Sequence, residues 1–442
     1  MKKILLVFSL VLLTVFSKTA SAQWSIDTLS YGRYSLAAAS AGSVALFGGG
    51  IGFTSNPYNA VDIYQNSVNF WGTSSLSQSR NYLSAAGTGT KILFAGGAND
   101  WILSVFDRVD IYNTTNNQWE TTSTLSAPRS HIGAAGAGTK IVFAGGQSWS
   151  AGTISNVVDI YDIVSGLWTA TTLSSQRHSV AGASSGNIIL FAGGAEVGGG
   201  FSNAVQMYDV TTGLWTSATL SVARSEAAAV GLGGKIYIGG GMSATGPSNR
   251  VDIYDVASNT WSIDSLSQAR TLLNAGATGN LVMFAGGCGQ SGSPVYNTVD
   301  ILDTTTVTWS AAQLMIPRYL AASTSVGNKI LFGGGSTDAG ITATVEIYEL
   351  INVGMSEVSI DELVMYPNPA VTEVNIENIL NNGNELQVEI MNMEGQKVKQ
   401  FTVPSNVPTS KISVEELGNG VYFYNIIESG SLKKTGRLVV VK

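Results

Sequence analysis

Cysteine and histidine are almost absent from this chain of 442 residues, which contains Cys288, His131 and His178 and no others of either type. A single cysteine cannot form an intramolecular disulfide, so the folded chain has to be stabilised by its core. The same scarcity excludes a zinc cluster and leaves carboxylates and carbonyls as metal ligands, a set that suits calcium better than a transition metal. We therefore expect no metal site and no cofactor.

Long apolar runs are also missing, apart from Ile4 to Phe16 near the N-terminus. This run is too short for a membrane-spanning helix, which needs about 20 apolar residues. Lys2 and Lys3 precede it, and Ala20-Ser21-Ala22 follows it with the small residues of a cleavage site. The sequence predicts a signal peptide over residues 1–22, a mature chain from Gln23 and no transmembrane segment.

Charge is sparse at 12%, whereas the chain has 51 glycines between its β-branched and aromatic runs, a composition typical of an all-β protein rich in turns. Tryptophans recur at intervals of 46–49 residues. They are Trp24, Trp71, Trp119, Trp168, Trp215, Trp261 and Trp309. Such a period indicates an internal repeat.

Each interval contains the same features in the same order. An arginine follows each tryptophan, at positions 33, 80, 129, 177, 224, 270 and 318, and a segment of small residues comes next. An apolar run then ends in two glycines, as in Ile92 to Gly97, and a long loop leads to an alternating tetrapeptide such as Val109-Asp110-Ile111-Tyr112. These segments predict four strands per repeat.

The order of Arg, Gly-Gly, Tyr and Trp over residues 24–349 resembles the kelch repeat, which implies one four-stranded propeller blade per copy. Seven copies imply a seven-bladed β-propeller over residues 23–350. The last copy has no tryptophan after Tyr348, whereas Trp24 precedes the first arginine. We therefore expect the N-terminal strand around Trp24 to complete blade seven and close the ring.

The periodicity stops after residue 350, and residues 351–362 are expected to form a linker. Residues 363–442 predict a small immunoglobulin-like β-sandwich, with Tyr366-Pro367-Asn368-Pro369 at its start and Leu417 to Phe423 near its end. These motifs resemble the type A sorting domain of the type IX secretion system. The resemblance implies a Gram-negative bacterial protein that is secreted or attached to the outer surface, with the secretion machinery as a partner of residues 363–442. The alternative is an immunoglobulin-like domain that contributes to adhesion.

We call the seven arginines that follow the tryptophans the arginine column. They could form an anion-binding ring, but an acidic residue recurs on the predicted third strand of the repeats, which favours structural pairing of each arginine with a carboxylate. With the arginines paired, no basic patch is left to follow a phosphate backbone, so nucleic acid is not expected as a partner. The fourth copy differs, because Gln206 replaces the acid. Arg177 is therefore the arginine most open to a ligand.

The two histidines follow arginines of neighbouring repeats, His178 by one residue and His131 by two. On strands of period two, these side chains are expected to point to opposite faces, which argues against a shared metal. Some kelch propellers are copper-radical oxidases, but Cys288 lies away from both histidine repeats. We predict no catalytic residues.

Because successive strands run antiparallel, the long loops after Gly-Gly and the turns that lead into each arginine emerge on the same face of the propeller. The aromatic residues expected to bind a ligand there are Phe53, Trp101, Trp149, Phe201 and Tyr296. Trp101 and Trp149 follow Gly-Gly in adjacent repeats, and flat aromatic surface suits sugar rings or protein hot spots. The alternative is that these rings fold back onto their own blades and fill the space beneath the loops.

Three functions remain open on the sequence. The leading hypothesis is an extracellular module that binds a glycan or a protein through the long-loop face. The second is an extracellular carbohydrate-active enzyme on a kelch propeller, and the third is a structural surface protein without a small ligand. Innermost strands with small residues, such as Gly133-Ala134-Ala135, favour binding over catalysis.

Overall fold

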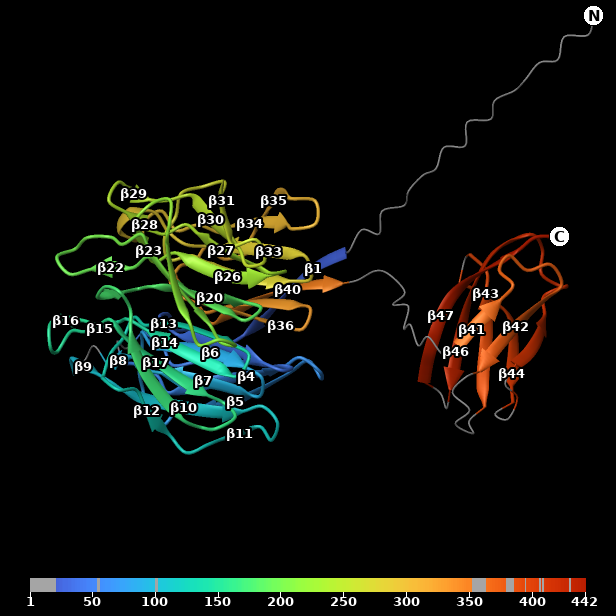
Figure 1. The fold of residues 1–442 in the computed structure, drawn as a ribbon, viewed down its shortest axis with the longest axis horizontal. Helices are drawn as coiled ribbons and strands as arrows, with labels where there is room; N and C mark the ends of the chain where they lie inside the picture. The colour runs from blue at the N-terminus through green and yellow to red at the C-terminus, as the bar shows by residue number, and fades with distance from the viewer. Residues whose placement is uncertain are drawn as a thin grey trace, which may run out of the picture. The chain divides into compact units, whose positions relative to one another are not determined.

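The computed structural model describes residues 21–53, 56–99, 102–351, 363–378, 385–393, 395–404, 407, 409–428 and 431–442. The predicted cleaved leader and the predicted linker lie almost wholly outside these residues. Two compact units are present, one spanning Ala22–Ile351 and one containing Asn352–Lys442. Figure 1 shows the first unit in blue to orange and the second in orange to red.

The first unit contains, within the described residues, seven antiparallel sheets, each with an innermost, a second, a third and an outermost strand. In one sheet, two short strands share the outermost position. The innermost strands are β2 (Ala37–Ala41), β6 (Ser84–Thr88), β13 (Gly133–Ala137), β20 (Ala181–Ser185), β26 (Ala228–Leu232), β32 (Asn274–Thr278) and β36 (Ala322–Val326). The second strands are β3 (Val44–Gly48), β7 (Lys91–Ala95), β14 (Lys140–Ala144), β21 (Ile188–Ala192), β27 (Lys235–Gly239), β33 (Leu281–Ala285) and β37 (Lys329–Gly333).

The third strands are β4 (Ala60–Gln65), β10 (Arg108–Asn113), β17 (Val157–Asp162), β23 (Ala204–Asp209), β30 (Arg250–Asp255), β34 (Thr298–Asp303) and β40 (Thr344–Ile351). The outermost strands are β5 (Phe70–Ser75), β11 (Gln118–Trp119) with β12 (Ser123–Thr124), β18 (Trp168–Thr172), β24 (Trp215–Thr219), β31 (Thr260–Ser265), β35 (Thr308–Gln313) and β1 (Ser21–Thr28).

Short strands and a 3-10 turn occur in the connections between these positions. They are β8 (Ala98–Asn99), β9 (Ser104–Val105), β15 (Gln147–Ser148), β16 (Thr153–Ile154), β19 (Arg177–His178), β22 (Ala195–Glu196), β25 (Arg224–Ser225), β28 (Met242–Ser243), β29 (Gly246–Pro247), β38 (Ser336–Thr337), β39 (Gly340–Ile341) and the turn η1 (Gln290–Gly292).

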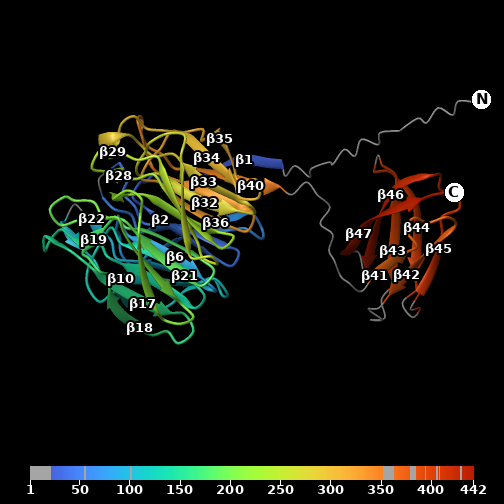
Figure 2. The ribbon, with the colours of Figure 1, turned by 45° about the horizontal axis from the view of Figure 1, so that its top comes forward.

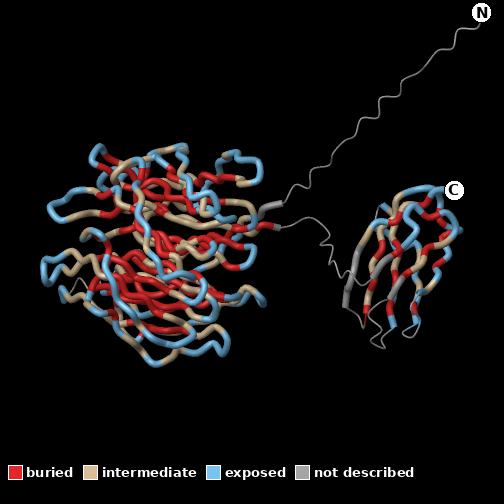
Figure 3. The backbone as a smooth tube through the Cα atoms, in the orientation of Figure 1, coloured by how far each residue is buried: buried red, intermediate tan, exposed pale blue. Residues whose placement is uncertain are grey.

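The position of a strand in its sheet follows from its residues. The second strands are apolar and buried almost throughout, whereas the outermost strands are largely exposed (Figure 3). The innermost strands carry small residues because neighbouring sheets approach closely there. A Cβ atom placed on Gly87 of β6 would lie 2.2 Å from the carbonyl oxygen of Ser40 on β2. Glycine is therefore required at this contact.

The seven sheets form a closed ring. Each innermost strand contacts the innermost strand of the next sheet, and β36 of the last sheet contacts β2 of the first. Figure 2 shows the sheets following one another in chain order around the unit. The seventh sheet has the order β1-β40-β37-β36, so its outermost strand comes from the N-terminal end of the unit. The first unit is thus a seven-bladed β-propeller.

The arginine column is structural. The guanidinium groups are buried, and six of them pair with a carboxylate on the third strand of the same sheet. These pairs are Arg33–Asp62, Arg80–Asp110, Arg129–Asp159, Arg224–Asp252, Arg270–Asp300 and Arg318–Glu346. Because these cations are paired below the surface, they present no charge to a nucleic acid.

The C-terminal unit is a β-sandwich of two antiparallel sheets within the described residues. One sheet contains β41 (Leu363–Tyr366), β42 (Glu373–Asn378) and β45 (Thr409–Ser413). The other contains β44 (Lys397–Val403), β43 (Leu386–Met391), β46 (Gly420–Glu428) and β47 (Ser431–Val440). Alternating residues of both sheets, such as Val374, Val388 and Leu438, are fully buried between them.

Asn368 of the Tyr-Pro-Asn-Pro motif holds the last strand of this sandwich. Its side-chain amide donates to the carbonyl of Arg437 at 2.6 Å, and its carbonyl oxygen accepts from the N–H of Val439 at 2.8 Å. The motif therefore binds the basic and apolar C-terminal strand as a neighbouring strand would.

No helix in the described part of the chain is long and apolar enough to span a membrane.

Candidate binding site at the mouth of the channel

Seven residues with the same unusual backbone form a ring where the innermost strands begin. Each lies two positions after a column arginine and has a positive φ of 49–55°. They are Ser35, Tyr82, His131, Ser179, Glu226, Leu272 and Leu320. We call this set the mouth ring. Its place before the innermost strands puts it on the same face as the long loops.

Main-chain hydrogen bonds join the members of the mouth ring from blade to blade. The N–H of Ser35 donates to the carbonyl of Leu320 at 2.9 Å, and the N–H of Tyr82 donates to that of Ser35 at 3.0 Å. The same bond links the next four members in turn, at 2.9–3.3 Å. Because the backbone makes these bonds, the seven side chains are left to line the channel mouth.

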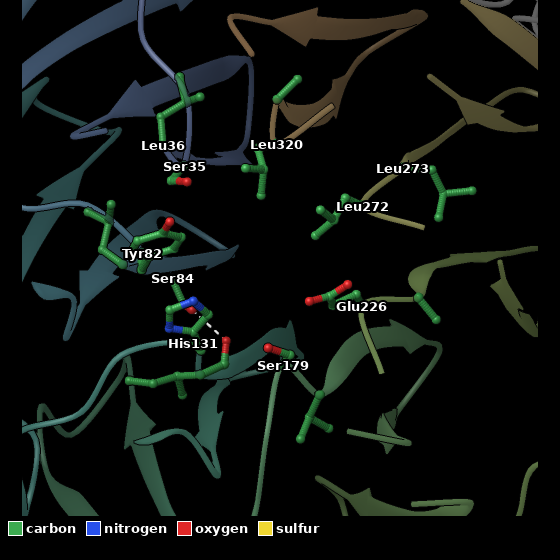
Figure 4. A pocket seen from close by; sticks show the side chains of 15 residues that line it. Ser35, Leu36, Tyr82, Ser84, His131, Ser179, Glu226, Leu272, Leu273 and Leu320 are labelled. Atoms are coloured by element: carbon green, nitrogen blue, oxygen red, sulfur yellow. Dashed lines mark hydrogen bonds between the residues drawn. The ribbon is translucent and has the colours of Figure 1, made fainter. Parts of the chain in front are cut away.

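A pocket of about 420 Å³ lies inside the mouth ring (Figure 4). Tyr82, His131, Ser179 and Glu226, from four consecutive blades, form a polar arc of its wall. Leu272 and Leu320 form an apolar arc. Deeper in the channel the lining consists mainly of small residues of the innermost strands, among them Ala38, Ala85, Ala134, Ala229 and Ala275.

Aromatic rings pack together on one side of the pocket. Tyr82 stacks on His131 with ring centroids 4.2 Å apart. Trp149, at the tip of the hairpin β15–β16, approaches Tyr82 at 5.6 Å and His131 at 5.3 Å. Trp149 remains 38% exposed, so the cluster presents aromatic surface to solvent.

The histidines differ from the sequence expectation. His131 and His178 do not point apart, because their ring centroids lie 6.0 Å apart in an edge-to-face arrangement. The alternation of a strand does not apply here, since the φ of +54° at His131 reverses the chain before the innermost strand starts. Among the described residues, no three His, Cys, Asp or Glu side chains gather as a metal site would require.

His131 is neutral in this site. Burial and, to a smaller extent, the neighbouring His178 together lower the pKa of its imidazole to about 3. The Nδ1 atom lies 3.2 Å from Ser130 Oγ and 3.4 Å from Gln147 Nε2. Because an amide nitrogen only donates, Nδ1 is the acceptor and the ring proton is on Nε2. His131 thus offers a neutral N–H donor.

Glu226 is the acidic member of the mouth ring. Its Oε2 accepts a hydrogen bond from Thr271 Oγ1 at 2.9 Å, which favours the charged form. Burial acts more strongly in the opposite direction and raises the pKa of the carboxyl group. The site therefore combines a neutral imidazole, a phenol and a partly desolvated carboxylate.

The other residues expected from the sequence lie elsewhere. Trp101 falls outside the described residues. Phe53 is 72% exposed on the long loop of the first blade, and Phe201 and Tyr296 are half-buried in their own loops. None of these three lines the pocket, and Trp149 adjoins it only through its packing on Tyr82 and His131.

Arg177 is not open to a ligand, contrary to the sequence interpretation. Its side chain is fully buried, and although Gln206 replaces the acid, the guanidinium donates to Gln206 Oε1 at 3.2 Å. It also donates to the carbonyls of Gly193, at 3.1 Å, and Ala204. Gln206 takes the place of the carboxylate, since its Oε1 also accepts the main-chain N–H of Ser174 at 2.7 Å.

The half-buried, neutral His131 makes the stability of the propeller depend on pH. The folded-state pKa is below the ordinary value of 6.5, so the unfolded chain gains a proton that the folded chain does not, and stability falls as pH drops below about 6.5. Asn tolerates positive φ, so His131→Asn keeps the backbone. Between pH 7 and pH 4 we expect the wild type to lose about 1–3 kcal/mol more than this variant in urea unfolding. Equal losses would contradict a lowered pKa of His131 in the folded state.

Comparisons with known proteins agree with this architecture. Residues 138–335 match a family described as the KLHDC2/KLHL20/DRC7 kelch-repeats domain, and residues 364–441 match one described as a secretion system C-terminal sorting domain. A solved structure titled "Structure of YjhT" is 14% identical, with a TM-score of 0.52, over 65% of this chain and 99% of that one. This similarity concerns the fold. No curated protein matches the chain.

Proposed function

Because this chain is a kelch-repeat propeller joined to a type IX secretion sorting domain, and is secreted or attached to the surface of a Gram-negative bacterium, we propose that it binds glycans outside the cell. The ligand lies in the pocket within the mouth ring. The sorting domain serves export, and the propeller carries the recognition.

The aromatic cluster of Trp149, Tyr82 and His131 is the observation that supports this proposal most directly. Aromatic rings at the rim of a polar pocket suit the apolar faces of sugar rings, while the surrounding polar groups suit the hydroxyls. The Nε2–H of His131 supplies a donor, and Glu226 supplies an acceptor. The pocket of about 420 Å³ is of the size that small ligands occupy in proteins.

The test is a glycan array probed with the full chain, beside the variants Trp149→Ala and Tyr82→Asn, the latter chosen because Asn tolerates positive φ. Loss of an aromatic wall is expected to weaken binding about tenfold or more, since such anchors contribute over about 1.4 kcal/mol. Phe53→Ala is the matched control, because Phe53 is an exposed loop aromatic outside the pocket. Retention of wild-type affinity by both pocket variants, or no glycan binding by any form, would refute the proposal.

A second candidate, a carbohydrate-active enzyme, is favoured by His131 and Glu226 in one pocket. A carboxyl group of raised pKa is a candidate general acid or base, and the neutral imidazole can donate a hydrogen bond to a substrate oxygen beside it. Incubating the protein with each bound glycan and following it by NMR separates the two functions. Conversion that is lost in Glu226→Gln would establish an enzyme, whereas an unchanged glycan supports binding alone.

A further inference from the structure

The formal charge of the pocket lining is negative only. Of the residues that line it, Glu226 alone carries a formal charge, because His131 is neutral. The column arginines lie beneath the mouth ring and are paired with carboxylates or, for Arg177, bound to carbonyls and Gln206. They offer no compensating charge in the pocket.

Among the described residues, Thr271 Oγ1 is the one hydrogen-bond donor to the Glu226 carboxylate, and no Lys or Arg nitrogen lies within 4.0 Å of it. Figure 4 shows the carboxylate directed into the pocket, with Ser179 between it and His131. Burial without a cation explains why its pKa is raised. A ligand cation at this position would remove the imbalance.

The remaining walls also favour a cation over an anion. Tyr82 in the wall, and Trp149 packed beside it at the rim, present π-systems, which attract ammonium groups through their negative faces. Leu272 and Leu320 give no donor that could solvate a carboxylate or a phosphate. An anionic ligand would meet the like charge of Glu226 in a partly desolvated site, which is unfavourable.

Resting on the proposed glycan-binding function, we propose that the pocket selects an amino sugar whose free ammonium group pairs with Glu226 while a sugar ring packs on Trp149 and Tyr82. A sugar fits better than a lysine side chain because the polar arc of the pocket extends over four blades. The Nε2–H of His131 and the Glu226 carboxylate lie on different blades, so a ring with several hydroxyls can contact both. A linear side chain would contact fewer of them.

The experiment is calorimetric titration of the full chain at pH 6.5 with three probes of equal length. These are a trimer of glucosamine, a trimer of N-acetylglucosamine and a trimer of galacturonic acid, which are cationic, neutral and anionic. We expect the glucosamine trimer to bind tightest and the galacturonic acid trimer weakest. Glu226→Gln keeps the shape of the side chain and an acceptor oxygen but removes the charge, so it is expected to weaken binding of the glucosamine trimer about tenfold or more and to abolish its advantage over the N-acetylated trimer.

The outcomes separate this inference from the function on which it rests. Equal affinity for the glucosamine and N-acetylglucosamine trimers, unchanged in Glu226→Gln, would overturn the charge selection and leave glycan binding in place. Binding to other glycans on the array without any of the three trimers would overturn it in the same way. Binding of a lysine peptide with no glycan binding would overturn both proposals.

Discussion

Asp110→Ala should lower the free energy of unfolding by about 3–5 kcal/mol, because it leaves the buried Arg80 guanidinium without its carboxylate. Arg80 Nη2 lies 2.6 Å from Asp110 Oδ2, with the two side chains 0% and 4% exposed. Asp110 Oδ1 also accepts the main-chain N–H of Ser77 at 3.0 Å. Burial already lowers the pKa of Arg80 to about 10 despite the carboxylate. Urea unfolding of the two proteins measures the loss.

Gln206→Ala is the matched control, because Gln206 holds the equivalent position in the fourth blade without a charge. Arg177 there keeps its bonds to the carbonyls of Gly193 and Ala204, so the loss is expected at about 1–2 kcal/mol, the size of hydrogen-bond deletions. If Asp110→Ala were no more costly than Gln206→Ala, the ion pairs would not be the feature that stabilises these turns.

Removal of residues 23–30 should abolish cooperative unfolding of the propeller. The strand β1 is the outer neighbour of β40, and its Trp24 packs edge-to-face on Tyr348 at 5.1 Å. The same segment contains Leu29, which is buried, and Ser30, whose N–H donates to Asp62 at 2.8 Å. Its loss would expose β40 as an unpaired edge, which favours aggregation.

Thermal unfolding followed by circular dichroism, together with size-exclusion chromatography, checks this second prediction. We expect a broad transition at much lower temperature and oligomers or aggregates in place of a single species. Ile26→Ala in the same strand is the control, because Ile26 is half-exposed and its truncation should change little. A truncated protein that melts as sharply as the full chain would show that the ring does not depend on this closure.

The fold could be predicted from the sequence because its signal is repeated. Tryptophan, arginine and Gly-Gly each recur in register, so an error in one copy is corrected by the others. The strand containing Trp24 lies in the seventh sheet, and the arginine and acidic columns meet as buried pairs. These features depend on the order of the repeated segments and on strand alternation, both of which can be read from the sequence pattern.

The site could be predicted only in part, because it depends on backbone reversals and distant contacts. Trp149 was identified from its loop, but its contact with Tyr82 joins residues of different blades and leaves no local pattern. Strand alternation predicts that the two histidines point apart, but the positive φ at His131 reverses the chain there, so the alternation does not apply. Glu226 and Ser179 carry a usable signal, since both lie two residues after a column arginine. That position varies among the copies, whereas the arginine two residues before it and an apolar residue directly after it are repeated.

The mouth ring separates what holds the propeller together from what faces the channel. Its seven residues join the blades through main-chain N–H and carbonyl groups, which every amino acid except proline possesses. Any side chain compatible with a positive φ can therefore occupy these positions without disturbing the closure of the ring. The side chains at these seven positions can therefore vary while the main-chain bonds between the blades stay the same. A library of variants at these positions, limited to residues that tolerate a positive φ, should yield folded propellers with altered ligand preferences.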